Sequence, residues 1–200
     1  LILDKEIQAI AIATPPKLHK KIIQFAIKNN KHIFCEKPFT TSYKDANFIC
    51  KLIEKKKNLS LMVNYEFGEI DAFRFFKKKI ANNLKVDKIK LNWFINIKNR
   101  SPKNWKESHS KGGGIVHNYV CHAIYYLEFL FGKILGIETN ISSEKKRKIL
   151  EGKLHFKNNL FVELNIKVGN IPEMNPIHQL KILTRKKNYI LETQLNSLSD

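Results

Sequence analysis

The stretch QAIAIATPPKLHKKIIQFAIKNNKHIFCEKPF, Gln8 to Phe39, predicts the fold of the N-terminal part of this chain. Its first seven residues form a short apolar run that ends at two prolines, which is typical of a buried strand in a parallel sheet. Apolar residues then recur at helical spacing from Lys17 to Asn29, and a second short strand follows from His32 to Cys35. This order of strand, helix and strand indicates a crossover unit of an α/β sheet.

The α/β pattern continues to about residue 66 and then changes. A helix capped by Thr41 or Ser42 and a third strand, Ser60–Tyr65, complete the first part. We expect residues 1–66 to form the C-terminal part of a Rossmann-like dinucleotide-binding domain. We expect residues 67–200 to form an α+β substrate-binding or oligomerisation domain, in which a mixed or antiparallel sheet is covered by a helix. Its predicted strands are Lys88–Ile97, Ile134–Thr139, Lys153–Phe156, Leu160–Val168, Leu180–Thr184 and Tyr189–Leu191.

The chain is strongly basic, with 36 Lys and Arg against 18 Asp and Glu and a net charge of +18 at pH 7. A basic chain can bind nucleic acid through its phosphates. However, nearly all of the excess is lysine scattered along the chain, whereas bidentate readout of phosphates and bases favours arginine. We therefore expect a solvated basic surface without a nucleic-acid partner, and a nucleic-acid-binding protein is the least favoured alternative.

The sequence contains no apolar run of about 18 residues, so we expect no membrane span. Its first residues do not resemble a signal peptide, because they are acidic and lack a basic leading segment. The three cysteines, Cys35, Cys50 and Cys121, have no paired spacing. This cysteine usage argues against a disulfide framework and favours the cytoplasm.

No glycine occurs between Leu1 and Asn64, although a dinucleotide-binding domain normally begins with a strand, a G-x-G-x-x-G turn and a helix. The chain also starts without methionine, almost directly in a strand. We therefore expect it to be a piece of a longer protein with a βαβ unit upstream.

A second motif, GGGIVHNYVCHAIYYLEFLFG, runs from Gly112 to Gly132. Its glycines allow close approach to another element or ligand and open a helix. Asn118 and His122 are four positions apart and therefore share a face of that helix. His117 and Cys121 make a similar pair, but further ligands at recognisable spacing are missing, so we expect no metal site.

The two motifs together resemble the NAD(P)-dependent glucose–fructose oxidoreductase, inositol dehydrogenase and MocA (Gfo/Idh/MocA) family, over most of residues 7 to 135. The resemblance implies hydride transfer between NAD or NADP and a hydroxyl-bearing carbon of a sugar, cyclitol or nucleotide-linked sugar. It implies that His122 is the catalytic acid/base, that Lys37 is an orienting cation, and that Asn118 positions a hydroxyl group or the imidazole. The implied cofactor-binding residues are Thr14, Pro15, Pro16, His19, Glu36, Lys37 and Pro38, with a cis peptide bond before Pro38. The implied substrate-binding residues are Asn64, Tyr65, Trp105 and Lys106.

Three positions of the second motif depart from the family pattern. Asn118 and Tyr125 stand where aspartate is common, and Val120 stands where glycine is common. Asparagine can form hydrogen bonds but cannot take a proton. A non-catalytic relative that acts as a ligand sensor, or a truncated inactive fragment, therefore stays as the alternative to an enzyme. We also expect a homo-oligomer, because a partner commonly covers an exposed sheet face.

Overall fold

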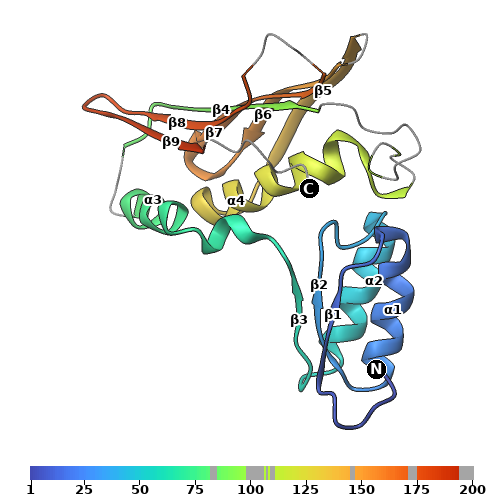
Figure 1. Ribbon diagram of the computed structural model, residues 1–200. Coiled ribbons are helices and arrows are strands. Elements are labelled where there is room, and N and C mark those ends of the chain that lie inside the picture. Colours follow the sequence, from blue (N-terminus) through green and yellow to red (C-terminus); the bar gives the residue numbers. More distant parts are fainter. Residues whose placement is uncertain are drawn as a thin grey trace. The chain divides into compact units, whose positions relative to one another are not determined.

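The computed structural model describes residues 1–81, 85–97, 106, 108, 111–144, 147–170 and 175–193. The chain divides into two compact units, Leu1–Glu66 with Pro102–His122 and Phe67–Ser101 with Ala123–Asp200. In its described part, the first unit contains a three-stranded sheet and the second a six-stranded sheet (Figure 1).

The sheet of the first unit is parallel throughout, in the order β1-β2-β3. Ile12, Cys35 and Val63 lie in register, so the three strands end at the same edge. Two helices form the crossovers, which confirms the predicted α/β pattern. The elements are β1 (Ala9–Ile12), α1 (Pro16–Lys28), β2 (His32–Cys35), α2 (Tyr43–Glu54) and β3 (Leu61–Val63).

The helix α1 begins and ends at residues suited to those positions. Pro16 starts it, because proline has the φ angle of a first helical residue and lacks an N–H that would go unpaired there. Asn30, just beyond its end, has a φ of 55°, a value that asparagine tolerates. Its apolar face packs into a core made by Ile12, Ile23, Ala26, Ile27, Ile33, Cys35 and Ile49.

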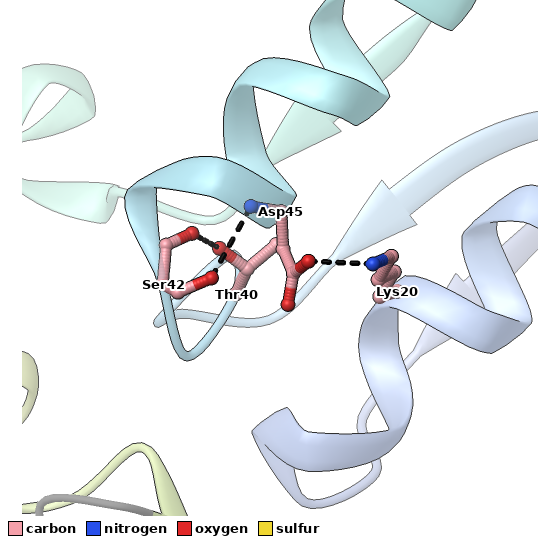
Figure 2. Close-up of polar contacts among 4 residues, drawn as sticks. All are labelled: Lys20, Thr40, Ser42 and Asp45. Atoms are coloured by element: carbon pink, nitrogen blue, oxygen red, sulfur yellow. Dashed lines mark hydrogen bonds and ion pairs between the residues drawn. The ribbon is translucent and has the colours of Figure 1, made fainter.

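The start of α2 is fixed by local polar contacts (Figure 2). The hydroxyl oxygen of Ser42 accepts a hydrogen bond of 3.2 Å from the backbone nitrogen of Asp45, so Ser42 is the cap residue. Thr40 donates its hydroxyl hydrogen to the Ser42 carbonyl oxygen at 2.7 Å. The Lys20 ammonium pairs with the Asp45 carboxylate at 2.5 Å, which joins α1 to α2.

One face of this parallel sheet is exposed within the described residues, so the prediction that the first strand is buried is correct for only one of its faces. Ile12 is buried, whereas Ala11, Phe34 and Met62 are exposed and lie in register across the three strands. Parallel sheets usually have both faces covered. Both crossover helices pack on the other side, against Ile12 and Ile33.

The second unit contains a mixed sheet in the order β5-β6-β7-β4-β8-β9. β4 runs parallel to β7, and the other neighbouring strands are antiparallel. This confirms the predicted mixed sheet domain. Its strands are β4 (Lys88–Asn96), β5 (Gly136–Glu144), β6 (Arg147–His155), β7 (Phe161–Gly169), β8 (Ile177–Leu183) and β9 (Asn188–Thr193). The 3₁₀ turns η1 and η5 span Glu66–Glu69 and Lys157–Asn159.

Two helices, α3 (Asp71–Ala81) and α4 (Cys121–Phe131), lie on the same side of this sheet, where one covering helix was predicted (Figure 1). An aromatic cluster joins the helices to the sheet. In it the Tyr126 hydroxyl lies 3.0 Å from the buried Nε2 of His178, and the Trp93 ring lies 4.5 Å from the imidazole. Phe67 and Phe73 complete the cluster.

The hairpin of β5 and β6 is longer than predicted. β5 reaches Glu144 and β6 begins at Arg147, and these two residues pair across the strands. The added part of β5 includes Asn140, Ser142 and Ser143, which give no apolar alternation to predict a strand from. The predicted turn at Lys157–Asn159 is confirmed, with positive φ angles at its two asparagines.

Candidate functional site

The loops that follow the three parallel strands lie together at one edge of the sheet. The backbone nitrogen of Glu36 donates to the Ile12 carbonyl at 2.9 Å, and that of Asn64 donates to the Cys35 carbonyl at 2.8 Å. The Asn64 side chain also donates to the Glu36 carboxylate at 2.8 Å. The predicted residues Thr14, Glu36 and Asn64 therefore lie at the edge where open α/β sheets bind ligands.

Two features of these loops agree with the sequence. The peptide bond between Lys37 and Pro38 is cis, as the resemblance implied. The Thr14 hydroxyl oxygen is buried and makes no hydrogen bond within the described part of the chain. A buried polar atom is costly without a partner, so this oxygen fits a site that receives a polar ligand.

His19 is fully buried in the first turn of α1. Its Nε2 lies 2.7 Å from the Thr14 carbonyl oxygen, and its Nδ1 lies 3.1 Å from the Pro38 carbonyl oxygen. The Cys35 sulfur lies 3.4 Å from Nδ1. Burial, together with the nearby charge of Glu36, raises the pKa of this thiol to about 12, so Cys35 stays a thiol.

The glycine stretch passes directly against the start of α1 and the loop before α2. Gly112 has a φ of +86°, and a Cβ added to it would lie 2.8 Å from Cβ of Pro16 and 3.1 Å from Cγ2 of Thr41. A side chain at this position has neither the backbone geometry nor the space. This confirms the expected close approach of the glycines to another element.

The segment after the glycines is a π-helical turn, Val116–Val120, that continues into α4. The backbone nitrogen of Cys121 donates to the Val116 carbonyl five residues earlier. The prediction that Asn118 and His122 share a helix face assumed α-helical spacing. It is modified here, because a π turn holds more than four residues and rotates later side chains around the axis. Such turns are frequent at functional sites.

Lys37 and His122 lie on the same side of the first unit. The Lys37 ammonium donates to the Asn118 carbonyl oxygen at 3.3 Å, within one turn of His122. His122 is buried, and the Tyr65 ring packs edge-on against its imidazole with 5.8 Å between ring centres. Three predicted site residues from strand-end loops and the second motif thus meet in one place.

The pKa of the Lys37 ammonium is lower than that of an ordinary lysine. Burial lowers its pKa below the ordinary value, while the charge of Cys121 raises it, and Lys106, as a second cation, lowers it. Glu36 and Glu66 have smaller raising effects. An amine with a lowered pKa gives up and takes back a proton more readily at neutral pH.

The Asn118 side chain contacts the chain upstream of the glycines. Its amide nitrogen donates to the Lys106 carbonyl oxygen at 2.7 Å, and the residue is buried. A carboxylate at this position could not donate that hydrogen bond. The role predicted for Asn118 toward a hydroxyl or the imidazole stays a prediction.

Sequence reasoning considered Cys121 only as a metal ligand, yet its thiol lies within this group. Cys121 donates to the His117 carbonyl oxygen at 2.9 Å and also forms a hydrogen bond with the Tyr65 hydroxyl. Burial raises the pKa of Cys121, whereas the Lys37 ammonium and the Tyr65 hydroxyl lower it. Burial raises the pKa of Tyr65, so it stays a phenol. Helical periodicity gave no signal for this contact, because the π turn changes the spacing.

The other predicted residues are less informative. Pro15 precedes α1, Pro16 begins it, and Trp105 lies outside the described residues. Among the residues that the structure describes, three or more His, Cys, Asp or Glu never gather in a way that could hold a metal ion. The described helices are all too short or too polar to cross a membrane.

Family profiles match both parts of the chain. The profile "Oxidoreductase family, NAD-binding Rossmann fold" matches residues 1–65, and "Oxidoreductase family, C-terminal alpha/beta domain" matches residues 77–199. The chain belongs to the Gfo/Idh/MocA oxidoreductase family. This confirms the resemblance inferred from the two motifs.

Similar proteins include an uncharacterized oxidoreductase, C26H5.09c, of Schizosaccharomyces pombe, which is 31% identical over 76% of this chain and 41% of its own length. The levoglucosan dehydrogenase complex with NADH and levoglucosan has a TM-score of 0.82 at 21% identity, over 96% of this chain and 56% of that one. Biliverdin reductase from Synechocystis, bound to biliverdin and NADP+, has a TM-score of 0.81 at 18% identity, over 96% and 62%. The chain spans about two fifths of the length of the curated relatives it matches.

Proposed function

We propose that the protein is an NAD(P)-dependent oxidoreductase that transfers a hydride to or from a hydroxyl-bearing carbon of a sugar or related polyol. The main support is the approach of the Lys37 ammonium to the turn that bears His122. A cation and an imidazole on neighbouring segments would provide the two groups that alcohol oxidation needs. Family membership and the NADH and NADP+ complexes of its structural neighbours support the cofactor.

The strand-end loops fit a dinucleotide. The buried Thr14 hydroxyl would gain a polar partner there, and Pro15, Pro16 and Glu36 to Pro38 border the same edge. We propose that residues 1–66 contribute to cofactor binding and that residues 67–200 contribute to substrate binding or oligomerisation. The bound nicotinamide would supply the hydride acceptor or donor.

The protein's own residues would manage the proton. His122 takes the hydroxyl proton of the substrate as the hydride leaves, and returns it in the reverse direction. Lys37 orients the same oxygen and stabilises negative charge on it. The lowered pKa of Lys37 would ease proton exchange at its amine at neutral pH.

A sugar or polyol is the substrate class that we propose, following the levoglucosan complex of the structural neighbour. Asn64, Tyr65 and Lys106 would offer amide, hydroxyl and ammonium groups to sugar hydroxyls, and Trp105 would offer an aromatic face. The biliverdin reductase neighbour shows that the same fold also receives a very different ligand. A substrate panel must therefore reach beyond sugars.

The experiment is a His122→Ala variant of the full-length protein, assayed by NAD(P)H absorbance over a panel of sugars, polyols and other alcohols. We expect turnover to fall by about 10²–10⁴-fold, the range for loss of a general acid/base. His155→Gln, in the sheet of the second unit, is the matched control and should keep turnover. Unchanged turnover in His122→Ala would exclude the assignment.

A second candidate is a non-catalytic ligand-binding relative. The observation that favours it is the engagement of the Asn118 amide with the Lys106 carbonyl, at a position where the family commonly has a carboxylate. This candidate predicts that NAD(P)H or a sugar raises the melting temperature of the full-length protein, while no alcohol in the panel produces NAD(P)H.

We further propose a cytoplasmic homo-oligomer. The three cysteines are free thiols, as the cytoplasm favours. Ile137 and Ile141 of β5 and Ile190 of β9 are exposed apolar side chains that a second copy would cover. Size-exclusion chromatography with light scattering measures the state directly, and a monomer at micromolar concentration would contradict it.

A further inference from the structure

The loops after β1 and β2 are short of hydrogen-bond donors. Pro15 and Pro38 lack a backbone N–H, so these loops have two donors fewer than their length would give, and Pro16 at the start of α1 lacks one too. Their carbonyl groups must still be paired where they are buried. A side chain that donates to them therefore determines the conformation that the loops adopt.

His19 occupies the position from which both loops can be reached. Its Nε2 lies 2.7 Å from the Thr14 carbonyl oxygen of the first loop. Its Nδ1 lies 3.1 Å from the Pro38 carbonyl oxygen and 3.3 Å from the Phe39 carbonyl oxygen of the second loop. The imidazole thus lies between the two loops and contacts both of them.

The burial of His19 decides whether its side chain can contact a cofactor or contacts only the protein's own loops. Its exposed fraction is 0%, so its own surface is covered by the loops and by Cys35. A side chain in that position contacts protein atoms on both ring nitrogens. The contact with the cofactor that the family resemblance implied for His19 has no exposed surface to use.

We propose that His19 is a positioning residue, which fixes the Lys37 ammonium by packing between the Thr14 and Pro38 carbonyl groups and donating to one of them from inside the domain. Pro38 is bonded directly to Lys37, and the Lys37 ammonium lies 3.3 Å from the Asn118 carbonyl oxygen. Release of the Pro38 carbonyl would let the loop, and with it the ammonium, move. The catalytic consequence of this movement rests on the proposed oxidoreductase function, whereas the movement itself does not.

The test compares His19→Leu and His19→Gln in the full-length protein. His19→Leu removes both hydrogen-bonding nitrogens at similar size, and His19→Gln keeps an amide that can reach one carbonyl. Lys31→Met is the matched control. Lys31 is also buried in the first unit and also donates to two backbone carbonyls, of Asp4 and Ile7, but before β1 rather than after it.

The first readout is the rate of reductive methylation of Lys37, measured by mass spectrometry without cofactor or substrate. We expect His19→Leu to raise this rate about tenfold, because loss of a hydrogen bond favours the locally open loop by roughly that factor, with His19→Gln in between. Lys31→Met should leave it at the wild-type value, although both variants lower the melting temperature. A wild-type rate in His19→Leu, with the fold intact by circular dichroism, overturns the proposal.

The second readout separates positioning from cofactor contact. We expect kcat of His19→Leu to fall about 10²-fold, because displacement of a reacting group by about 1 Å has that cost, while Kd for NADH changes less than threefold. A rise in Kd of tenfold or more with unchanged Lys37 methylation would show direct cofactor contact and overturn the proposal. If no variant turns over any alcohol, the proposed function fails, and the methylation rates still decide the role of His19.

Discussion

The ammonium nitrogen of Lys37 lies 3.3 Å from the carbonyl oxygen of Asn118, a residue 81 positions further along the chain. This contact joins the loop after β2 to the π-helical turn before α4. It also sets the charge environment of Cys121, because a cation close to a thiol stabilises the thiolate. The thiol therefore reports on the position of the ammonium.

Replacement of Lys37 by methionine should raise the pKa of Cys121, because the variant lacks the charge that stabilises the thiolate. The midpoint of the pH profile for alkylation of Cys121 by iodoacetamide should move up by about one unit, which is the usual size of a nearby charge effect. Mass spectrometry of the three cysteines gives the profile, with the exposed Cys50 as internal reference.

The control for this prediction is Lys20→Met, which removes a lysine that pairs with Asp45. Its Cys121 profile should match the wild-type profile. A Lys37→Met profile that stays in place or moves to lower pH would show that the ammonium does not act on this thiol. The midpoint, rather than the rate, is the measured quantity, because a smaller side chain also changes access.

Gly112 and Gly132 provide a matched pair for measuring the close approach of the glycine stretch. Their φ angles are +86° and +88°, but an added Cβ at Gly112 would meet Pro16 and Thr41, whereas at Gly132 it would meet no atom within 4 Å. Gly132→Ala should cost only the backbone strain of about 1–2 kcal/mol. Gly112→Ala should cost about 1–3 kcal/mol more, the range for overpacking.

Urea unfolding of both variants measures this difference. Equal free energies of unfolding for Gly112→Ala and Gly132→Ala would mean that the glycine segment does not pack against α1. A larger loss in Gly112→Ala, together with faster proteolysis of the first unit, is the expected result.

The sequence predicted those elements whose apolar pattern and end signals agree. The first crossover unit follows from the apolar run before Thr14, the prolines at the start of α1 and the asparagines at its end, and the structure has it within a few residues. The edge hairpin of β5 and β6 was predicted too short. The added residues of β5 are mostly polar and exposed, so backbone pairing rather than an apolar pattern makes them a strand.

The candidate site was predictable to a similar extent. The motifs predicted Lys37 and His122 as site residues, which stays a prediction, and the structure brings their segments together. The contact of Cys121 with Tyr65 was not predictable, because α-helical counting assigns four residues to a turn that is π-helical here. The buried bridging position of His19 was also hidden, since a histidine in a first helical turn is usually exposed.

His178 should make the stability of the second unit depend on pH. Burial lowers the pKa of its imidazole from 6.5 to about 4, so the folded state holds it neutral while the unfolded chain binds a proton below about pH 6.5. The contribution of His178 to the free energy of unfolding is therefore fully present above pH 6.5 and is lost as the pH falls toward 4. The loss is about 3 kcal/mol, from the shift of roughly 2.5 units.

Urea unfolding followed by Trp93 fluorescence measures this loss, because the Trp93 ring lies 4.5 Å from the imidazole of His178. A Trp105→Phe background removes the second tryptophan signal. In a His178→Gln variant the free energy of unfolding should be lower at pH 7, because Tyr126 loses its partner. It should, however, change little between pH 6.5 and 4.5. If the free energy of unfolding changes equally with pH in the wild type and the variant over that range, another group titrates and the buried imidazole is not responsible.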